Sequence, residues 1–130
     1  MTKTTGLILA LSLLLSINAW AADDPSIKGE LRGNIQQSMS DFINSQTVNG
    51  NMYVYDAVNG DLLKLKLDKL HSGIVKKGGF YVSCADFKDQ NNRKIDIDFF
   101  VVPNEGRMVT TQAFVHSIDG NKRKYHLEDL

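Results

Sequence analysis

Side chains that could bind a metal ion or transfer protons occur on segments that we expect to form strands. They are His71, Cys84, Asp86, Asp96, Asp98 and His116. Cys84 and Asp86 are two residues apart, so both point to one face of an extended strand, and the same holds for the second aspartate pair. Imidazole, thiolate and carboxylate groups suit zinc or copper when three or four of them converge. The competing interpretation is ordinary structure, in which the cysteine packs as a small apolar residue and the aspartates are solvated.

The candidate metal or thiol site drawn from this set consists of His71, Cys84, Asp86 and His116. The two histidines have similar neighbours, Leu-His-Ser and Val-His-Ser, each near the end of a long expected strand. A curved sheet would bring both to one rim as a metal-binding or pH-sensitive pair. The alternative is that the similarity is coincidental. A redox-active Cys84 is not favoured, because no neighbouring residue lowers the pKa of its thiol.

Motifs of the common enzyme classes are absent from the sequence. The chain has no glycine-rich phosphate loop, no G-x-S-x-G, no H-E-x-x-H and no C-x-x-C. Residues 86–97 fail as an EF-hand loop, which needs a central glycine and a terminal glutamate. A metabolic enzyme is therefore not expected, and no cofactor is predicted. An acid–base hydrolase would have to use Asp96 with His116, which we expect to lie too far apart.

Aromatic side chains favour a different function, the binding of a small ligand or a protein partner. The rings that we expect on the solvent-facing side of the sheet are Tyr53, Tyr55, Tyr81 and Phe100. Aromatic residues gathered on an exposed surface mark interaction sites. The main functional prediction is therefore a non-enzymatic binding domain, with the metal or thiol site as the alternative. Burial of these rings in cross-strand packing would argue against the prediction of a binding domain.

Two strands joined by a polar turn are expected over residues 80–102. One face of the second strand carries Ile95, Ile97, Phe99 and Val101. Charged residues fall on its other face, which is the two-residue period of a strand with one buried side. An apolar layer must therefore cover this strand.

An amphipathic helix precedes the strands and can supply that cover. Asp24-Pro25 favours a helix start, because aspartate caps free N–H groups and proline suits the first helical position. Apolar residues then recur at intervals of three and four as far as Ile43. This spacing predicts a helix over residues 25–45.

A hairpin is expected where Asn59-Gly60 separates two alternating segments, because this pair favours a two-residue type I′ turn. That turn would place Met52 opposite Leu67. The strand after the turn is expected to run to His71 and to break near Gly73. Further strands are predicted over Arg107–Ile118 and, after Asp119-Gly120, over residues 122–127.

Short turns between consecutive strands favour an antiparallel meander. The sequence thus predicts an α+β domain, with one N-terminal helix packed on a curved antiparallel sheet of about five or six strands. This order of elements resembles the cystatin-like and NTF2-like architectures, in which a sheet wraps a helix.

Residues 1–21 have the features of a signal peptide. A lysine precedes an apolar run, and the Ala-Trp-Ala that ends at Ala21 has the small residues that signal peptidase accepts. The run is short for a membrane span, which needs about 20 apolar residues. We expect cleavage after Ala21, one domain over residues 22–130, and a periplasmic or secreted protein with no membrane span after cleavage.

Charge and cysteine content narrow the range of partners. Of 15 basic and 15 acidic residues, one lysine precedes residue 22, so residues 22–130 carry a net charge of −1. Nothing in this balance attracts the domain to nucleic acid. Cys84 is the only cysteine, so no internal disulfide can form and stability must come from packing. The identity of the ligand or partner and the oligomeric state stay open.

The string F-Y-x-x-C-A-D-F from Phe80 and the string I-D-x-D-F-F from Ile95, bracketed by His71 and His116, resemble a pattern in small exported bacterial proteins. The helix-plus-sheet order is more loosely similar to periplasmic PepSY-type domains. These resemblances imply a family and a compartment rather than an activity.

Overall fold

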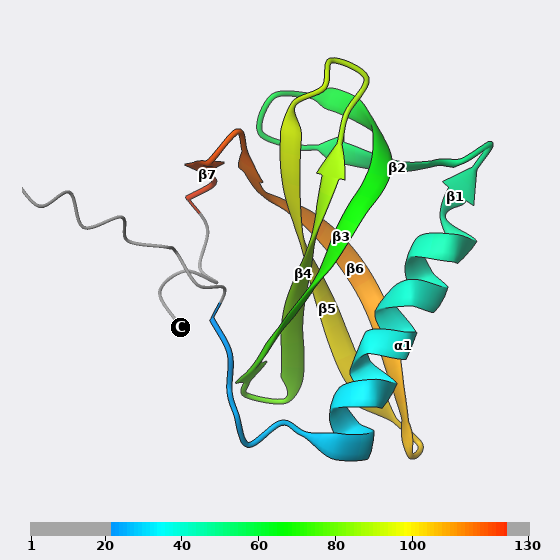
Figure 1. The fold of residues 1–130 in the computed structure, drawn as a ribbon, viewed down its shortest axis with the longest axis vertical. Coiled ribbons are helices and arrows are strands. Elements are labelled where there is room, and N and C mark those ends of the chain that lie inside the picture. The colour runs from blue at the N-terminus through cyan, green and yellow to red at the C-terminus, as the bar shows by residue number, and fades with distance from the viewer. Residues whose placement is uncertain (1–21, 125–130) are drawn as a thin grey trace, which may run out of the picture.

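The structure is a computed structural model that describes residues 22–124. Within these residues one helix precedes seven strands, which form one antiparallel sheet in chain order (Figure 1). The elements are α1 (Gly29–Ser45), β1 (Thr47–Val48), β2 (Asn51–Asp56), β3 (Asp61–Lys77), β4 (Phe80–Lys88), β5 (Lys94–Asn104), β6 (Arg107–Ile118) and β7 (Asn121–Lys122). The fold is therefore α+β with a curved sheet, as predicted. The strand count exceeds the predicted five or six because β1, a two-residue strand that was not predicted, extends the sheet beyond β2.

The helix α1 lies across one face of the sheet, against β5 and β6 (Figure 1). Its buried stripe consists of Ile35, Ser38, Met39 and Ile43. Their spacing of three and four residues places them on one side of a helix. Beside this stripe, Phe42 meets Phe99 of β5 edge to face, with ring centroids 6.0 Å apart.

The two strands expected over residues 80–102 are β4 and β5, which pair antiparallel along their length. The predicted apolar face of β5 is confirmed. Ile95, Ile97, Phe99 and Val101 are each 0% exposed. Full burial of such side chains stabilises a fold by roughly 1.5–3 kcal/mol each, so this face is the centre of the core.

The prediction that the strand after the Asn59-Gly60 turn breaks near Gly73 is wrong. β3 continues to Lys77, and the irregularity is a bulge between Leu70 and Ile74 in the pairing with β4. Glycine inside a strand commonly marks such a bulge. The glycine therefore changes the course of the strand without ending it.

The β2–β3 hairpin has a longer loop than predicted. Met52 faces Leu65 instead of Leu67, and four residues connect the strands instead of two. Asp56 closes this wider loop, because its side chain and its carbonyl accept hydrogen bonds from two loop N–H groups at 3.1 and 2.8 Å. The register differs from the prediction by two residues, so the apolar face of β2 keeps its orientation.

The helix begins at Gly29, four residues later than predicted. Asp24 caps a tight turn instead of the helix. Its Oδ1 accepts hydrogen bonds from the N–H and the hydroxyl of Ser26 at 2.9 and 2.7 Å, and its carbonyl accepts one from Ile27 N at 3.0 Å. Ile27 is only 3% exposed, so this turn contributes to the core.

The predicted signal peptide falls on residues 1–21, and much of the predicted last strand falls on residues 125–130, both outside the described residues. Within residues 22–124, no helix has the length and apolar character of a membrane span.

Candidate metal centre

The side of the sheet opposite α1 carries a polar cluster built on the two central strands. Across β4 and β5, Cys84 pairs with Asp98 and Asp86 pairs with Asp96. The residues that alternate with them belong to the hydrophobic core, so these four side chains point to the other face. This face is nonetheless covered, since Asp86 and Asp98 are 8% and 5% exposed.

His71 reaches the polar cluster from the bulge in β3. Leu70 and Ile74 pair with residues only two positions apart on β4, so three residues of β3 oppose the single residue Cys84. A bulge bends its strand and redirects a side chain. Here it brings the imidazole of His71 against the side chains of β4.

The imidazole of His71 contacts two side chains of β4. Nδ1 lies 2.7 Å from Sγ of Cys84, and Nε2 lies 2.9 Å from Oδ2 of Asp86. In a neutral ring the nitrogen that faces the carboxylate carries the proton, because a carboxylate only accepts hydrogen bonds. Nδ1 then faces Sγ of Cys84 without a proton, and Asp86 fixes this tautomer. The same Asp86 oxygen lies 3.4 Å from Nζ of Lys94.

His116 lies at the other end of the polar cluster, on β6. It is the extra residue of a second bulge, because the residues on either side of it pair with the neighbours Asp96 and Ile97 of β5. Its Nδ1 lies 2.9 Å from Oδ2 of Asp98. Both histidines therefore come from bulges, and each contacts an aspartate of the cluster.

Burial and like charge make the polar cluster unfavourable for anions. Burial raises the pKa of the Cys84 thiol far above its usual value, and the carboxylates of Asp96, Asp98 and Asp86 raise it further. Burial also raises the pKa of Asp96, with an added contribution from the charge of Asp98. Oδ1 of Asp86 and Oδ1 of Asp96 are buried and accept no hydrogen bond from the described residues. A cation placed here would offset all of these costs.

Three donors converge closely enough for such a cation. His71, Cys84 and Asp96 each offer a ligand atom, and the three atoms lie within 4.8 Å of one another. Tetrahedral zinc holds a nitrogen and a sulfur ligand about 3.6 Å apart. An entering ion would therefore replace the thiol proton and separate Nδ1 and Sγ from their present 2.7 Å. Asp86, on the second ring nitrogen, completes the carboxylate–histidine–metal arrangement common in zinc proteins.

The structure brings together three of the four residues selected from the sequence, namely His71, Cys84 and Asp86. His116 instead contacts an aspartate on β5, and Asp96 joins the three-donor group. Asp96 and His116, expected to lie far apart, are close enough for the histidine to oppose the rise in the pKa of the carboxyl group. Sequence reasoning missed the contact of Lys94 with Asp86 and both bulges, because no residue periodicity signals them.

The tyrosines of β2 are on the surface, as predicted. Tyr53 and Tyr55 are 42% and 64% exposed. They border an open pocket of about 240 Å³ that is also lined by Phe42 of α1, by Gln46 directly after this helix and by Ala113 of β6. This pocket lies apart from the polar cluster, since the two share no residue.

The other two aromatic residues have different surroundings. Tyr81 is 9% exposed and belongs to the core, so its predicted place on the open face is wrong. Phe100 is partly buried between Phe80 and Phe114, with ring centroids 5.3 and 4.9 Å away. The four rings therefore form no single patch.

No protein-family model, curated protein or solved structure matches this chain. The chemistry of the centre is accordingly inferred from its own residues.

Proposed function

We propose that the protein binds a divalent metal ion of the zinc type at His71, Cys84 and Asp96. The support is the convergence of their three donor atoms within 4.8 Å, with the second imidazole nitrogen held by Asp86 at 2.9 Å. Nitrogen, thiolate sulfur and carboxylate oxygen are the ligand types that Zn²⁺ takes in proteins. Three protein ligands leave a fourth position for water or a bound molecule. Such a centre could hold a metal ion, and a molecule bound to that ion, in a protein that is not an enzyme.

A metal ion suits these residues better than thiol catalysis. Cys84, His71 and Asp86 do have the contacts of a nucleophile, a base and an orienting acid. A reactive cysteine, however, needs electropositive surroundings that lower its thiol pKa. Burial and three aspartates raise the pKa of Cys84 instead. A bound cation reverses that balance, because it stabilises the thiolate and offsets the carboxylates.

Titration of untagged protein with Co²⁺, a spectroscopic substitute for zinc, tests the proposal. We expect one Co²⁺ per chain, with thiolate-to-cobalt absorption that added Zn²⁺ removes. Cys84→Ala should abolish this absorption, and Asp96→Asn should weaken binding at least about tenfold. Asp68→Asn is the matched control, because this aspartate is exposed on β3, and it should bind as the wild type does. Absence of saturable Co²⁺ binding by the wild type would refute a metal site.

A second candidate function is the binding of a small ligand or a protein partner at Tyr53 and Tyr55. Its support is the exposure of both rings, 42% and 64%, beside the pocket of about 240 Å³. Phenol is a suitable probe, since a pocket bordered by aromatic rings favours an aromatic guest. We expect phenol to shift the ring NMR signals of both tyrosines and Tyr55→Ala to reduce the affinity. Unchanged ring signals at saturating phenol would remove this candidate.

We further propose that the protein is exported with loss of residues 1–21 and that its architecture is cystatin-like. The charged start, apolar run and Ala-Trp-Ala site support export. The order of one helix followed by a curved meander supports the architecture. Mass measurement of protein from the periplasmic fraction of an expressing bacterium should find Ala22 at the N-terminus. Recovery of the full-length chain in the cytoplasm alone would refute export.

A further inference from the structure

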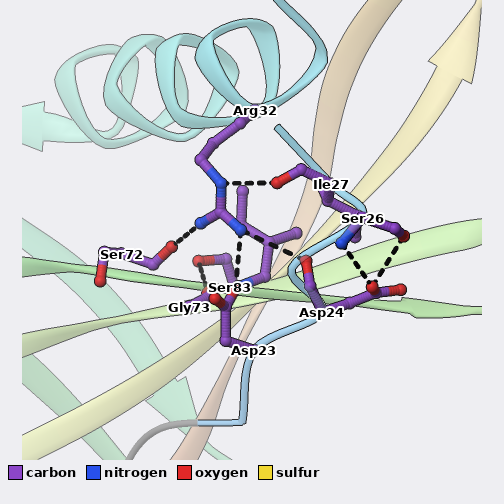
Figure 2. A network of polar contacts seen from close by, with 9 residues as sticks. Asp23, Asp24, Ser26, Ile27, Arg32, Ser72, Gly73 and Ser83 are labelled. Carbon is purple, nitrogen blue, oxygen red and sulfur yellow. Dashed lines mark hydrogen bonds and ion pairs between the residues drawn. The ribbon is translucent and has the colours of Figure 1, made fainter. Parts of the chain in front are cut away.

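Residues 23–27, here called the N-terminal strap, run beside β3 at the bulge that carries His71 (Figure 2). The strap pairs with β3 at Ile74. Asp24 N donates to the carbonyl of Ile74 at 2.8 Å, and Ile74 N donates to Oδ1 of Asp23 at 3.0 Å. β2 pairs with β3 only over Asp61 to Leu65, so the strap takes the place of a neighbouring strand farther along β3.

Arg32 of α1 joins this strap to the bulge (Figure 2). Its Nε donates to the carbonyl of Ile27 at 2.6 Å, and its Nη2 donates to Oδ1 of Asp23 at 2.7 Å. Its Nη1 donates to the carbonyl of Ser72, which is the residue after His71. The hydrogen bond from Arg32 is the main reason that the pKa of Asp23 lies below its usual value. One guanidinium thus connects helix, strap and bulge.

Four backbone groups at the end of the bulge find partners through this arrangement. Arg32 satisfies the carbonyl of Ser72, and the hydroxyl of the buried Ser83 donates to the carbonyl of Gly73 at 2.7 Å. The strap satisfies both the N–H and the carbonyl of Ile74. Extra residues in a bulge lose their ladder partners. An unpaired carbonyl would be costly at the buried Gly73, whereas the carbonyl of Ser72 is exposed and is held in place by the charged Arg32. The bulge therefore depends on Arg32 and the strap for its conformation.

We propose that Arg32 is the positioning residue of the metal centre and that docking of the N-terminal strap sets the affinity of the centre for its ion. This inference rests on the proposed metal binding. His71 reaches Cys84 only because three residues of β3 oppose one residue of β4. Without Arg32, the chain at Ser72 samples other conformations, and the imidazole occupies its binding position for only part of the time. The apparent dissociation constant rises by the inverse of that fraction.

The test compares Arg32→Ala and Arg32→Lys with a matched control, Arg93→Ala. Arg93 is also a partly exposed arginine in an ion pair with an aspartate, at 2.7 Å, but in the β4–β5 turn. We expect Arg32→Ala to weaken Co²⁺ binding at least tenfold and Arg93→Ala to leave it unchanged. Arg32→Lys should recover part of the affinity, because an ammonium group can still bind the carboxylate. Asp23→Asn is the milder variant if Arg32→Ala fails to fold.

A second measurement tests the positioning role of Arg32 independently of metal binding. In metal-free protein, the imidazole NMR signals of His71, assigned with His71→Gln, should shift in Arg32→Ala and not in Arg93→Ala. The inference would be overturned if Arg32→Ala binds Co²⁺ as tightly as the wild type does and its His71 imidazole signals do not shift. If the wild type binds no Co²⁺, the metal function fails. The NMR comparison alone then decides whether Arg32 positions His71.

Discussion

Sγ of Cys84 lies 2.7 Å from Nδ1 of His71, although the two residues are 13 positions apart on different strands. The contact exists because a bulge in β3 places three residues opposite the cysteine. The centre is thus a product of the pairing of adjacent strands, and no short sequence motif encodes it.

The Cys84 thiol should react slowly with iodoacetamide in the folded, metal-free protein. Burial and the neighbouring aspartates raise the pKa of this thiol, and only the thiolate reacts. We expect alkylation at about pH 8 to be at least tenfold slower in buffer than in denaturing urea. The rate can be followed by mass spectrometry. Equal rates in the two conditions would contradict the raised pKa.

Asp96→Asn should stabilise the metal-free protein at neutral pH. Burial, assisted by Asp98, raises the pKa of Asp96, so its charged form is less favourable in the folded state than in the unfolded state. That penalty acts above the usual carboxyl pKa and is absent where both states are protonated. With chelator at about pH 7, we expect Tm to rise by roughly 2–5 °C, and at about pH 3 not at all. A lower Tm at pH 7, with exposed Asp68→Asn unchanged, would show that Asp96 stabilises the fold instead.

Asp89→Asn should destabilise the protein in a pH-dependent way. Burial alone would raise the pKa of Asp89, but hydrogen bonds from Arg93 and Asn91 at 2.7 to 2.9 Å outweigh it and lower the pKa. This stabilisation is present above the usual pKa of 3.8 and is lost as pH falls through the folded-state value. We expect a loss of about 1 kcal/mol near neutral pH that shrinks at lower pH. Urea unfolding of both proteins at several pH values measures this loss of unfolding free energy. A loss that does not change with pH would contradict the lowered pKa of Asp89.

Phe99→Ala should severely destabilise the domain. Phe99 is 0% exposed, and its ring contacts Phe42 and Phe87 at centroid distances of 6.0 and 6.4 Å. Loss of a buried phenylalanine costs about 3–5 kcal/mol. Leu62→Ala is the control, because Leu62 is 60% exposed, and it should change the unfolding free energy by less than about 0.5 kcal/mol. Similar losses for both variants in urea unfolding would mean that β5 does not face the core.

Much of the fold could be predicted because burial leaves a periodic pattern in the sequence. The alternation through Ile95, Ile97 and Phe99 correctly identified the buried face of β5. The spacing that ends at Ile43 correctly identified the buried stripe of α1. The helix start was misplaced because Asp24 can cap a turn as well as a helix, and the sequence does not distinguish these uses.

The centre could be predicted only in part, because its geometry depends on bulges. The two-residue spacing of Cys84 and Asp86 correctly placed both on one face. The approach of His71 and His116 required extra residues in β3 and β6, and such register shifts follow from pairing with neighbouring strands. The role of Arg32 could not be predicted from the sequence, because the fold brings its partners Asp23 and Ser72 to it.

X-ray absorption spectroscopy at the zinc K edge of the zinc-loaded protein tests the central claim most directly. It reports the atoms bound to the ion and their distances. Ligation by His71, Cys84 and Asp96 predicts one sulfur at about 2.3 Å together with nitrogen and oxygen ligands at about 2.0–2.2 Å, including the scattering of one imidazole. Loss of the sulfur in Cys84→Ala would assign that ligand. A shell of oxygen and nitrogen alone in the wild type, unchanged by Cys84→Ala, would contradict a metal centre at this thiol.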